Sequence, residues 1–356
     1  MTSRERVLTS LRHEVPDRVP RLLYEEVVGY PPALQKMLAE KCAPLSPREY
    51  FSMDIASVAL QPTRLSRDRF APWYTAHPAV LASGQVDEWG VWRQPGSFHH
   101  FSHIESPLKD VSDFGQLQDF PWPDQDQPER FVGLADEIAR LHDRGLAVAG
   151  RAGSIFEQAW YIRGLESLLA DLLTEPAQAR YFLERTAYYQ RVIAEQLTRL
   201  GVDIIITGDD VAGQTGLLMS IEVWRDFLKP LQKSTVTAVK RINTETKIFY
   251  YSDGNIVPLI PDLIETGIDI LNPLQPECLD PAEVKKQYGH KLSFWGAVSV
   301  QRTLSLGSAA QVGAEVRERV KTVGAGGGYI LAPAHILGPE TPWENIVAFF
   351  KAADEC

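Results

Sequence analysis

The stretch Lys247-Ile-Phe-Tyr-Tyr-Ser-Asp-Gly-Asn255 decides the fold, because it joins a short apolar run to an abrupt polar end. Such a run predicts a buried strand that delivers a carboxylate and an amide into a turn. Three further stretches have the same form: 204–210, 268–275 and 328–335. Repeated apolar strands that each end in a polar side chain are typical of a parallel barrel with an active site at one rim. We therefore expect an enzyme.

The composition narrows the class of protein. A length of 356 residues suits one undivided barrel of alternating strands and helices. Hydrophobic residues make up 44% of the chain and charged residues 23%, which is ordinary for a globular protein with a substantial core. The net charge of −10 argues against nucleic acid or an anionic membrane as a partner. The three cysteines are scattered, which favours a reducing cytoplasm over a disulfide framework.

The N-terminus predicts a short amphipathic helix capped by Thr2 or Ser3, without the apolar core of a signal peptide. No apolar run approaches the roughly 20 residues that cross a bilayer. We expect a cytoplasmic protein.

Alternating patterns predict eight strands, at 18–24, 53–60, 146–149, 203–207, 247–251, 268–271, 291–295 and 328–331. The helices predicted between and around them span 3–12, 131–144, 164–174, 176–200, 220–242, 257–266, 281–288, 308–322 and 341–353. Eight strands alternating with helices indicate an α/β fold, a (β/α)8 barrel of the TIM type. We expect one domain over residues 1–356.

Residues 64–130 interrupt this pattern with many Trp, Pro, His and Asp residues. We interpret them as an insertion over one rim of the barrel, with a hairpin at 87–92 and an extended linker at 120–124. Its aromatic side chains form either an apolar lid or a small satellite core: Trp73, Tyr74, Trp89 and Trp92. Its histidines have near-metal spacing but no nearby fourth ligand, and we interpret them as solvated or capping residues: His99, His100 and His103.

In a barrel of this type the side chains just after each strand carry the chemistry. That rule selects Tyr24, Glu25, Gln61, Arg151, Asp209, Asp210, Tyr251, Asp253, Asn255, Asn272, Gln275 and His335. Each has a structural alternative. Asp209 and Asp210 are adjacent, so at most one is expected to point inward, and an Asp after a strand also caps a helix. Arg151 pairs either with a substrate anion or with one of these aspartates.

Two strand ends stand out for chemistry. Asp253 precedes Gly254, which allows backbone to approach a ligand, although a plain Asp-Gly turn is the alternative. His335 follows the small residues Ala-Pro-Ala, and its strand should end opposite Asp253. The glycine run at 324–328 precedes a strand and does not join a strand to a helix, so it lacks the geometry of a phosphate loop.

Several segments together resemble the uroporphyrinogen decarboxylase superfamily, in its corrinoid-dependent methyltransferase branch. They are Arg4-Glu-Arg-Val-Leu8, Arg12-His13, Pro16-Asp-Arg-Val-Pro20, Tyr251-Ser-Asp-Gly-Asn255, Gly267-Ile-Asp-Ile-Leu-Asn-Pro-Leu-Gln275, Phe294-Trp-Gly-Ala297, Gly328-Tyr-Ile-Leu-Ala-Pro-Ala-His335 and Pro342-Trp-Glu-Asn345. The resemblance spans nearly the whole chain and implies a distorted eight-stranded barrel.

The chain departs from both well-known activities of that superfamily. The decarboxylases carry an arginine-rich stretch after the first strand, where this chain has Glu25 and Glu26, and an Asp after the next strand, where it has Gln61. The thiol methyltransferases hold zinc with a His-x-Cys pair and a further Cys, where this chain has Tyr251, Asp253 and His335. These harder ligands suit thiolate activation poorly. Zinc stays open only as a weaker site at Asp253 and His335.

The resemblance therefore implies a methyltransferase that moves a methyl group from a small donor, chiefly an O-methyl or methoxylated aromatic compound, to the cobalt of a corrinoid. Because the chain lacks the Asp-x-His-x-x-Gly pattern of a cobalt-ligating module, the corrinoid should arrive on a partner protein. The expected catalytic residues are Asp209, Tyr251, Asp253 and His335. The expected substrate-binding residues are Tyr24, Glu25, Arg151, Asp210 and Gln275.

Three alternatives stay open at this point. The chain transfers a methyl group from a methylated corrinoid to a folate or pterin, acts as a decarboxylase or lyase on a small acid held by Arg151, or carries a corrinoid without catalysis. The sequence leaves the methyl donor and the oligomeric state undetermined.

Overall fold

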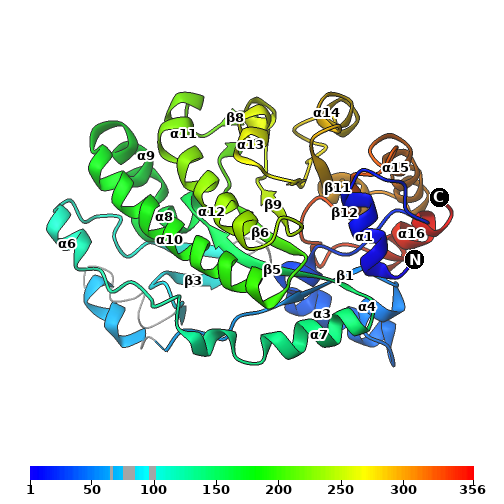
Figure 1. Cartoon of the computed structure of the whole chain (residues 1–356), viewed down its shortest axis with the longest axis horizontal. Coiled ribbons are helices and arrows are strands. Elements are labelled where there is room, and N and C mark those ends of the chain that lie inside the picture. Colours follow the sequence, from blue (N-terminus) through cyan, green and yellow to red (C-terminus); the bar gives the residue numbers. More distant parts are fainter. Residues whose placement is uncertain (65–66, 75–84, 96–101) are drawn as a thin grey trace.

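A curled parallel sheet forms the centre of the molecule (Figure 1). The computed structural model describes residues 1–64, 67–74, 85–95 and 102–356. Within those residues seven strands pair in the order β1-β5-β6-β9-β10-β11-β12. They span β1 Ile55–Val58, β5 Ala147–Ser154, β6 Ile204–Gly208, β9 Lys247–Tyr251, β10 Ile270–Asn272, β11 Ser293–Val298 and β12 Tyr329–Pro333. All of these pairings are parallel, so the carboxyl ends of the strands meet at one rim.

The expected first strand, at 18–24, is wrong as a strand, because only Arg21 forms a bridge, to Leu331 of β12. The Leu22 N–H donates to the Leu331 carbonyl at 3.1 Å, and the Asp54 N–H donates to the Arg21 carbonyl at 3.0 Å. This short segment thus links β12 to β1. Pro20 has no N–H to donate, which limits the ladder at this point. The distorted barrel is confirmed, with one strand reduced to a bridge.

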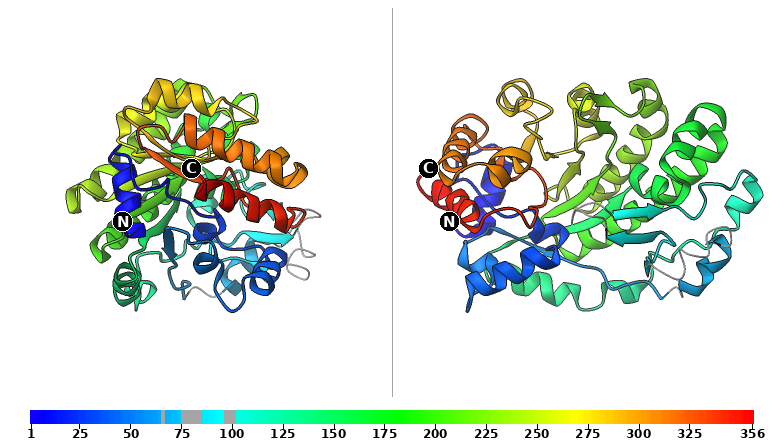
Figure 2. Two further views of the ribbon diagram at one scale, coloured as in Figure 1. Left: turned by 90° about the vertical axis from the view of Figure 1, so that its right-hand side faces the viewer. Right: turned by 180° about the vertical axis from the view of Figure 1, so that it is seen from behind.

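Helices cover the outside of the sheet, and the two chain ends lie close together beside α1, α15 and α16 (Figures 1 and 2). The helices that the sequence predicted are α1 Ser3–Leu11, α7 Leu134–Asp143, α9 Leu165–Thr174, α10 Pro176–Leu200, α11 Ile221–Phe227, α12 Lys229–Ile242, α13 Ile260–Thr266, α14 Pro281–Tyr288, α15 Ala309–Thr322 and α16 Trp343–Asp354. Thr2 caps α1 with a full capping box. The predicted helix 220–242 is divided at Leu228, because Pro230 cannot lie inside a continuous helix.

Other elements were not predicted. They are the helices α2 Glu25–Val28, α3 Pro32–Cys42, α4 Pro47–Tyr50, α6 Phe114–Gln118 and α8 Phe156–Arg163, the 3-10 turns Arg67–Tyr74 and Pro128–Phe131, the π-helix Val300–Leu304, and the hairpin of β7 Ala212–Gly213 and β8 Gly216–Leu217. The predicted helix 257–266 begins as a 3-10 turn at Val257–Leu259 and continues as α13. Within the described part of the chain, no helix is long and apolar enough to cross a membrane.

The insertion contains a small antiparallel sheet of β2 Gln85–Val86, β3 Trp92–Pro95 and β4 Ser102–Glu105. Val86 pairs with Trp92, which confirms the hairpin predicted at 87–92, and residues 120–124 form neither helix nor strand. Tyr74 is buried, and its hydroxyl donates to the Gly90 carbonyl at 2.6 Å, while Trp73 packs edge-on against Phe120. These contacts favour the satellite core. His103 lies in β4, and His99 and His100 lie outside the described residues.

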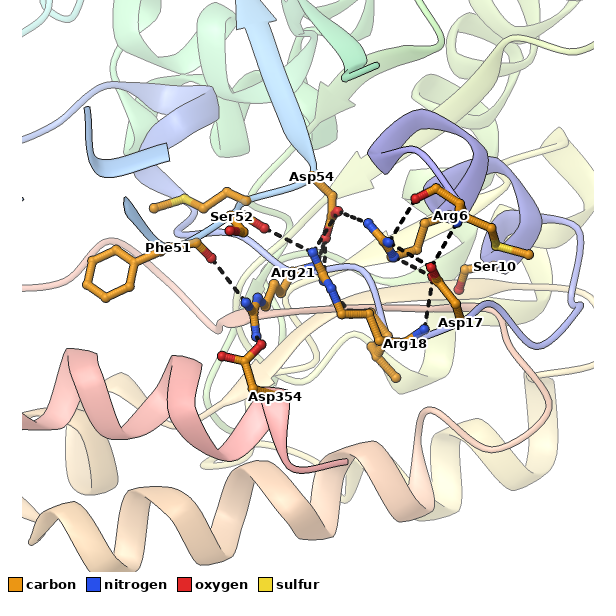
Figure 3. A network of polar contacts seen from close by, with 12 residues as sticks. Arg6, Ser10, Asp17, Arg18, Arg21, Phe51, Ser52, Asp54 and Asp354 are labelled. Carbon is orange, nitrogen blue, oxygen red and sulfur yellow. Dashed lines mark hydrogen bonds and ion pairs between the residues drawn. The ribbon is translucent and has the colours of Figure 1, made fainter. Parts of the chain in front are cut away.

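A buried ion network closes the amino end of the barrel (Figure 3). Asp54 is fully buried just before β1, and its carboxylate accepts hydrogen bonds from Arg6 at 2.7 Å and from Arg18 at 2.7 and 3.0 Å. Asp17 also binds Arg6, at 2.6 and 2.8 Å. Three of the residues in the N-terminal family-like motifs therefore fasten α1 and the bridging segment to β1, at the end of the barrel opposite the rim. The expectation of one domain over residues 1–356 stays a prediction.

Candidate active site

A continuous cleft lies at the carboxyl ends of the strands. Its central cavity, of about 280 Å³, is lined by Tyr24, Arg151, Glu157, Tyr251 and His335 among others. A second cavity of about 440 Å³, the carboxylate cavity, shares the last three of these residues and adds Asp210, Asp253 and Gln275. A third of about 650 Å³, the large cavity, shares Arg151 with the central one and extends beneath the insertion. The rim position agrees with the location of active sites in barrels of this type.

Two tyrosines and a histidine form the wall of the central cavity. The rings of Tyr24 and Tyr251 are stacked, with centroids 6.1 Å apart and planes 12° from parallel. The His335 ring centroid is 6.5 Å from that of Tyr251. Burial raises the pKa of both tyrosine hydroxyls, so both stay neutral phenols over the physiological range. The arrangement offers flat aromatic surface to a bound ring.

The carboxylates beside them are linked to one another and to His335. The His335 Nε2 atom lies 3.7 Å from Asp253 Oδ2, and the Asp253 N–H donates to Asp210 Oδ1 at 2.8 Å. Burial, reinforced by the nearby charges of Asp253 and Glu157, raises the pKa of Asp210 to about 8. Burial also raises the pKa of Asp253, while His335 opposes that shift. These shifts favour the protonated form of Asp210 at neutral pH.

Asp209 and Asp210 take different positions, as their adjacency required. Asp209 is fully buried and lines none of the three cavities. Its Oδ1 accepts the Glu157 N–H at 2.9 Å at the start of α8, and its Oδ2 accepts from Gln232 Nε2 at 3.3 Å. Burial raises the pKa of Asp209 to about 8. These contacts favour a structural role, and the catalytic role expected of Asp209 stays an untested prediction.

Glu157 is a site residue that sequence reasoning missed. It lines both the central and the carboxylate cavity, and it accepts hydrogen bonds from Ser154 Oγ at 2.9 Å and from the Tyr161 hydroxyl. The strand before it was expected to end at residue 149, whereas β5 continues to Ser154. The spacing Ser154-x-x-Glu157 is the pattern of a helix start and is the signal that predicts α8.

The other predicted residues divide between the cleft and its supports. Gln275 lines the carboxylate cavity, and its Oε1 accepts the Gly254 N–H at 3.0 Å. Asn272 donates to the Trp295 carbonyl at 2.9 Å, which is a buried structural contact. Asn255 does not cap the helix that follows, because its Oδ1 has no hydrogen-bond partner in the described structure. Gln61 lies outside the three cavities.

Glu25 lies in the wall of the large cavity and is buried. Its Oε1 accepts the Leu337 N–H, and its Oε2 has no partner among the described residues. Burial raises the pKa of Glu25 to about 7. The substrate-binding role predicted for Glu25 is compatible with this position.

The residues of the cleft do not fit a zinc site. Among the described residues, no group of three or more His, Cys, Asp or Glu side chains is arranged to hold a metal ion. Asp253 and His335 offer only two ligands.

Comparison with known proteins places the chain in a family. The uroporphyrinogen decarboxylase (URO-D) family matches residues 91–356, and the chain belongs to that family. A uroporphyrinogen decarboxylase from Trichodesmium erythraeum is 28% identical over 51% of this chain and 48% of its own. The methylcobamide:CoM methyltransferase MtaA from Methanosarcina barkeri is 27% identical over 54% of this chain and 57% of its own. The chain thus matches about half the length of these two relatives.

The likeness of fold extends over the whole chain. A methyltransferase from Methanosarcina mazei superimposes with a TM-score of 0.72 at 19% identity, covering 100% of this chain and 99% of its own. The resemblance expected from the sequence is confirmed, both to the family and to its corrinoid methyltransferase branch. These relatives are enzymes of two kinds, decarboxylases and a methyltransferase.

Proposed function

We propose that this protein is a methyltransferase that takes a methyl group from a small O-methyl donor, such as a methoxylated aromatic compound, and transfers it to the cobalt of a corrinoid carried by a partner protein. One observation carries the proposal. An acid that stays protonated at neutral pH, Asp210, lines the same cleft as the stacked rings of Tyr24 and Tyr251. An aryl methyl ether needs both an aromatic surface and a proton for its leaving oxygen.

The charge of the cleft supports methyl transfer over porphyrinogen decarboxylation. A substrate with many carboxylates would meet the acidic side chains of Glu157 and Asp253 at the rim. Arg21 lies in the stretch where the decarboxylases are arginine-rich, but its guanidinium binds the carbonyls of Phe51 and Phe350 and the carboxylate of Asp354. Figure 3 shows its guanidinium turned toward Phe51 and Asp354, and Arg21 lines none of the three cavities.

The corrinoid, when its carrier is docked, supplies the cobalt nucleophile that accepts the methyl group. The side chains of His335 and Asp253 keep 29% and 33% of their surface exposed, which leaves this part of the cleft open to solvent. The residues of this chain hold the donor ring against Tyr24 and Tyr251 and exclude water from it. As the bond between the methyl carbon and the ether oxygen breaks, Asp210 gives its proton to that oxygen. The phenol leaves, and Asp210 is protonated again from solvent.

His335 and Asp253 lie near Tyr251, since the His335 ring centroid is 6.5 Å from that of Tyr251 and the His335 Nε2 is 3.7 Å from Asp253 Oδ2. We propose that this pair orients the Tyr251 hydroxyl and keeps negative charge beside Asp210, which keeps its proton in place at neutral pH. Gln275 fixes the turn that carries Asp253 through the Gly254 N–H.

A spectroscopic assay tests the function. The protein is mixed with a reduced corrinoid protein and with methoxybenzoates, guaiacol-type phenols, methanol or glycine betaine, and the cobalt(I) absorbance is followed. Loss of cobalt(I) with an O-methyl donor supports the proposal. Decay of a methylated corrinoid on addition of folate would reverse the direction of transfer, and release of carbon dioxide without any corrinoid would support the decarboxylase.

A further inference from the structure

The large cavity beneath the insertion has no role in the methyl transfer described so far. Residues of α2, β5 and α8 form one side, and Glu88, Trp89 and Arg130 of the insertion form another. Its volume of about 650 Å³ lies within the range of small-molecule sites. Arg151 lines both this cavity and the central one, so it stands at their junction.

Among the charged residues of the cavity wall, one cation has no anionic partner. Arg48 pairs with Glu26 at 2.6 Å, and Arg130 pairs with Glu88 at 3.2 Å. Arg151 makes no ion pair or hydrogen bond through its guanidinium to any residue that the structure describes, and it is solvent-exposed. The remaining acid, Glu25, has no cationic partner, and burial raises its pKa to about 7. When Glu25 is protonated, which its pKa of about 7 allows at and below neutral pH, the wall carries a single unbalanced positive charge.

Several polar atoms of this wall also lack partners. Arg130 is only 5% exposed, and its Nη1 donates to no atom of the described residues. The same holds for Gln158 Nε2. Buried donors in folded proteins are nearly always hydrogen-bonded, so two such donors around one cavity indicate a ligand that accepts. An arginine with a planar set of donors is the side chain best suited to a carboxylate.

We propose that the large cavity binds the carboxylate of the methyl donor, which makes the donor a small organic monoanion of the methoxylated aromatic acid class. The proposal rests on the function proposed above. The carboxylate lies against Arg151, with Arg130 and Gln158 deeper in the wall. The ring extends from there into the central cavity, toward Tyr24 and Tyr251. Because Arg48 and Arg130 are already paired with Glu26 and Glu88, a second carboxylate would find no unpaired cation among the described residues of the wall, which restricts the ligand to one negative charge.

Calorimetric titration of the wild-type protein without a corrinoid tests the pocket. The probes are 4-methoxybenzoate and its methyl ester, which share the ring and the methoxyl group and differ in charge. The acid should bind roughly 10- to 100-fold more tightly than the ester, because a charge-assisted hydrogen bond to arginine usually strengthens binding by about this ratio. Equal affinities, or tighter binding of the ester, would overturn the proposal without any variant.

Two variants sharpen the test. Arg151→Gln removes the charge and should weaken binding of the acid roughly 10- to 100-fold while leaving the ester unchanged. Arg144→Gln is the matched control, because Arg144 forms an exposed ion pair with Glu49. This variant should change neither the affinity for the acid nor that for the ester. An unchanged affinity of the folded Arg151→Gln protein for the acid would refute the assignment.

The pocket and the proposed function fail separately. If the acid binds through Arg151 but transfers no methyl group to a corrinoid, the pocket stands and the methyltransferase fails. If carboxylated donors are demethylated at equal rates by the wild type and by Arg151→Gln, the methyltransferase stands and the pocket fails.

Discussion

The sharpest prediction concerns the proton on Asp210. In the wild type the Asp253 N–H donates to Asp210 Oδ1 at 2.8 Å. The Asn side chain of Asp210→Asn can still accept this hydrogen bond, so the turn that carries Asp253 should be kept. Burial raises the pKa of Asp210 to about 8, so the protonated form is favoured at pH 7. Removing this proton should slow demethylation of a phenyl methyl ether by roughly 10²- to 10⁴-fold, which is the usual contribution of a general acid.

The pH profile gives the sign of the effect. Because the acid form acts, the wild-type rate should be level below pH 8 and fall about tenfold per pH unit above it. The Asp210→Asn protein should lack this alkaline fall. Asp253→Asn should move the fall to lower pH, because the charge of Asp253 is the second largest cause of the raised pKa of Asp210.

The leaving group provides the control. A methyl ether of a nitrophenol leaves as a weakly basic phenolate and needs little protonation, so Asp210→Asn should slow it much less than it slows anisole derivatives. The assay is stopped-flow loss of the cobalt(I) absorbance at saturating donor. Equal losses for both leaving groups, or an alkaline fall that persists in Asp210→Asn, would refute the role given to Asp210.

Three further predictions concern stability and the site's support. Asp54→Ala should lower the free energy of unfolding by about 3–5 kcal/mol in urea titrations, because it removes a fully buried carboxylate that accepts from Arg6, Arg18 and the Arg21 N–H, and only Arg6 keeps a second carboxylate, Asp17. Glu14→Ala removes an exposed pair and should have little effect. Gly254→Ala should lower both the melting temperature and the activity, because the φ of Gly254 is +84° and a Cβ there would lie 2.5 Å from a backbone oxygen of the β7–β8 hairpin. The control is Gly201→Ala, which has a φ of +95° and open space around it, and it should lower the free energy of unfolding by only ~1–2 kcal/mol. Burial raises the pKa of Asp209 from 3.8 to about 8, so its contribution to stability is lost as pH rises from about 4 to 8. Across that window the free energy of unfolding of Asp209→Asn should rise relative to the wild type, by up to roughly 4 kcal/mol at pH 7. Parallel curves of unfolding free energy against pH for the two proteins would contradict this.

The strands were predictable because their signal is local. Apolar runs such as 247–251 and 203–207 are bounded by Gly and polar residues, and β9 and β6 match them to within one residue. The segment 18–24 has a similar apolar core, but its outcome depends on partners far away in sequence. Arg18 turns to Asp54 and Pro20 limits the ladder, and neither effect can be read from a short window.

The position of a site residue was predictable where its place at the end of a strand is enough to put its side chain at the rim. Asp253 and His335 were expected to lie opposite one another, and their side chains are 3.7 Å apart. Asp209 and Asp210 could not be distinguished from sequence, because the position of the start of α8 decides which of the two carboxylates accepts a hydrogen bond from its backbone N–H. Glu157 was missed because Gly150 and Gly153 hide the second half of β5 from an apolar pattern. The catalytic and binding roles of these residues stay predictions.

The large cavity was beyond sequence reasoning for a different reason. Its donors come from β5, α8 and the insertion, and only the fold shows that Arg130 and Arg48 are neutralised while Arg151 is not.

One measurement tests the central claim most directly. The donor 4-methoxybenzoate, labelled with ¹³C at both the methoxyl and the carboxyl carbon, is incubated with the protein and a reduced corrinoid protein, and the carbon spectrum is recorded over time. We predict that the methoxyl label moves to the corrinoid while the carboxyl label stays in the 4-hydroxybenzoate that is formed. Release of labelled carbon dioxide with the methoxyl group intact would contradict the account and assign the cleft to decarboxylation.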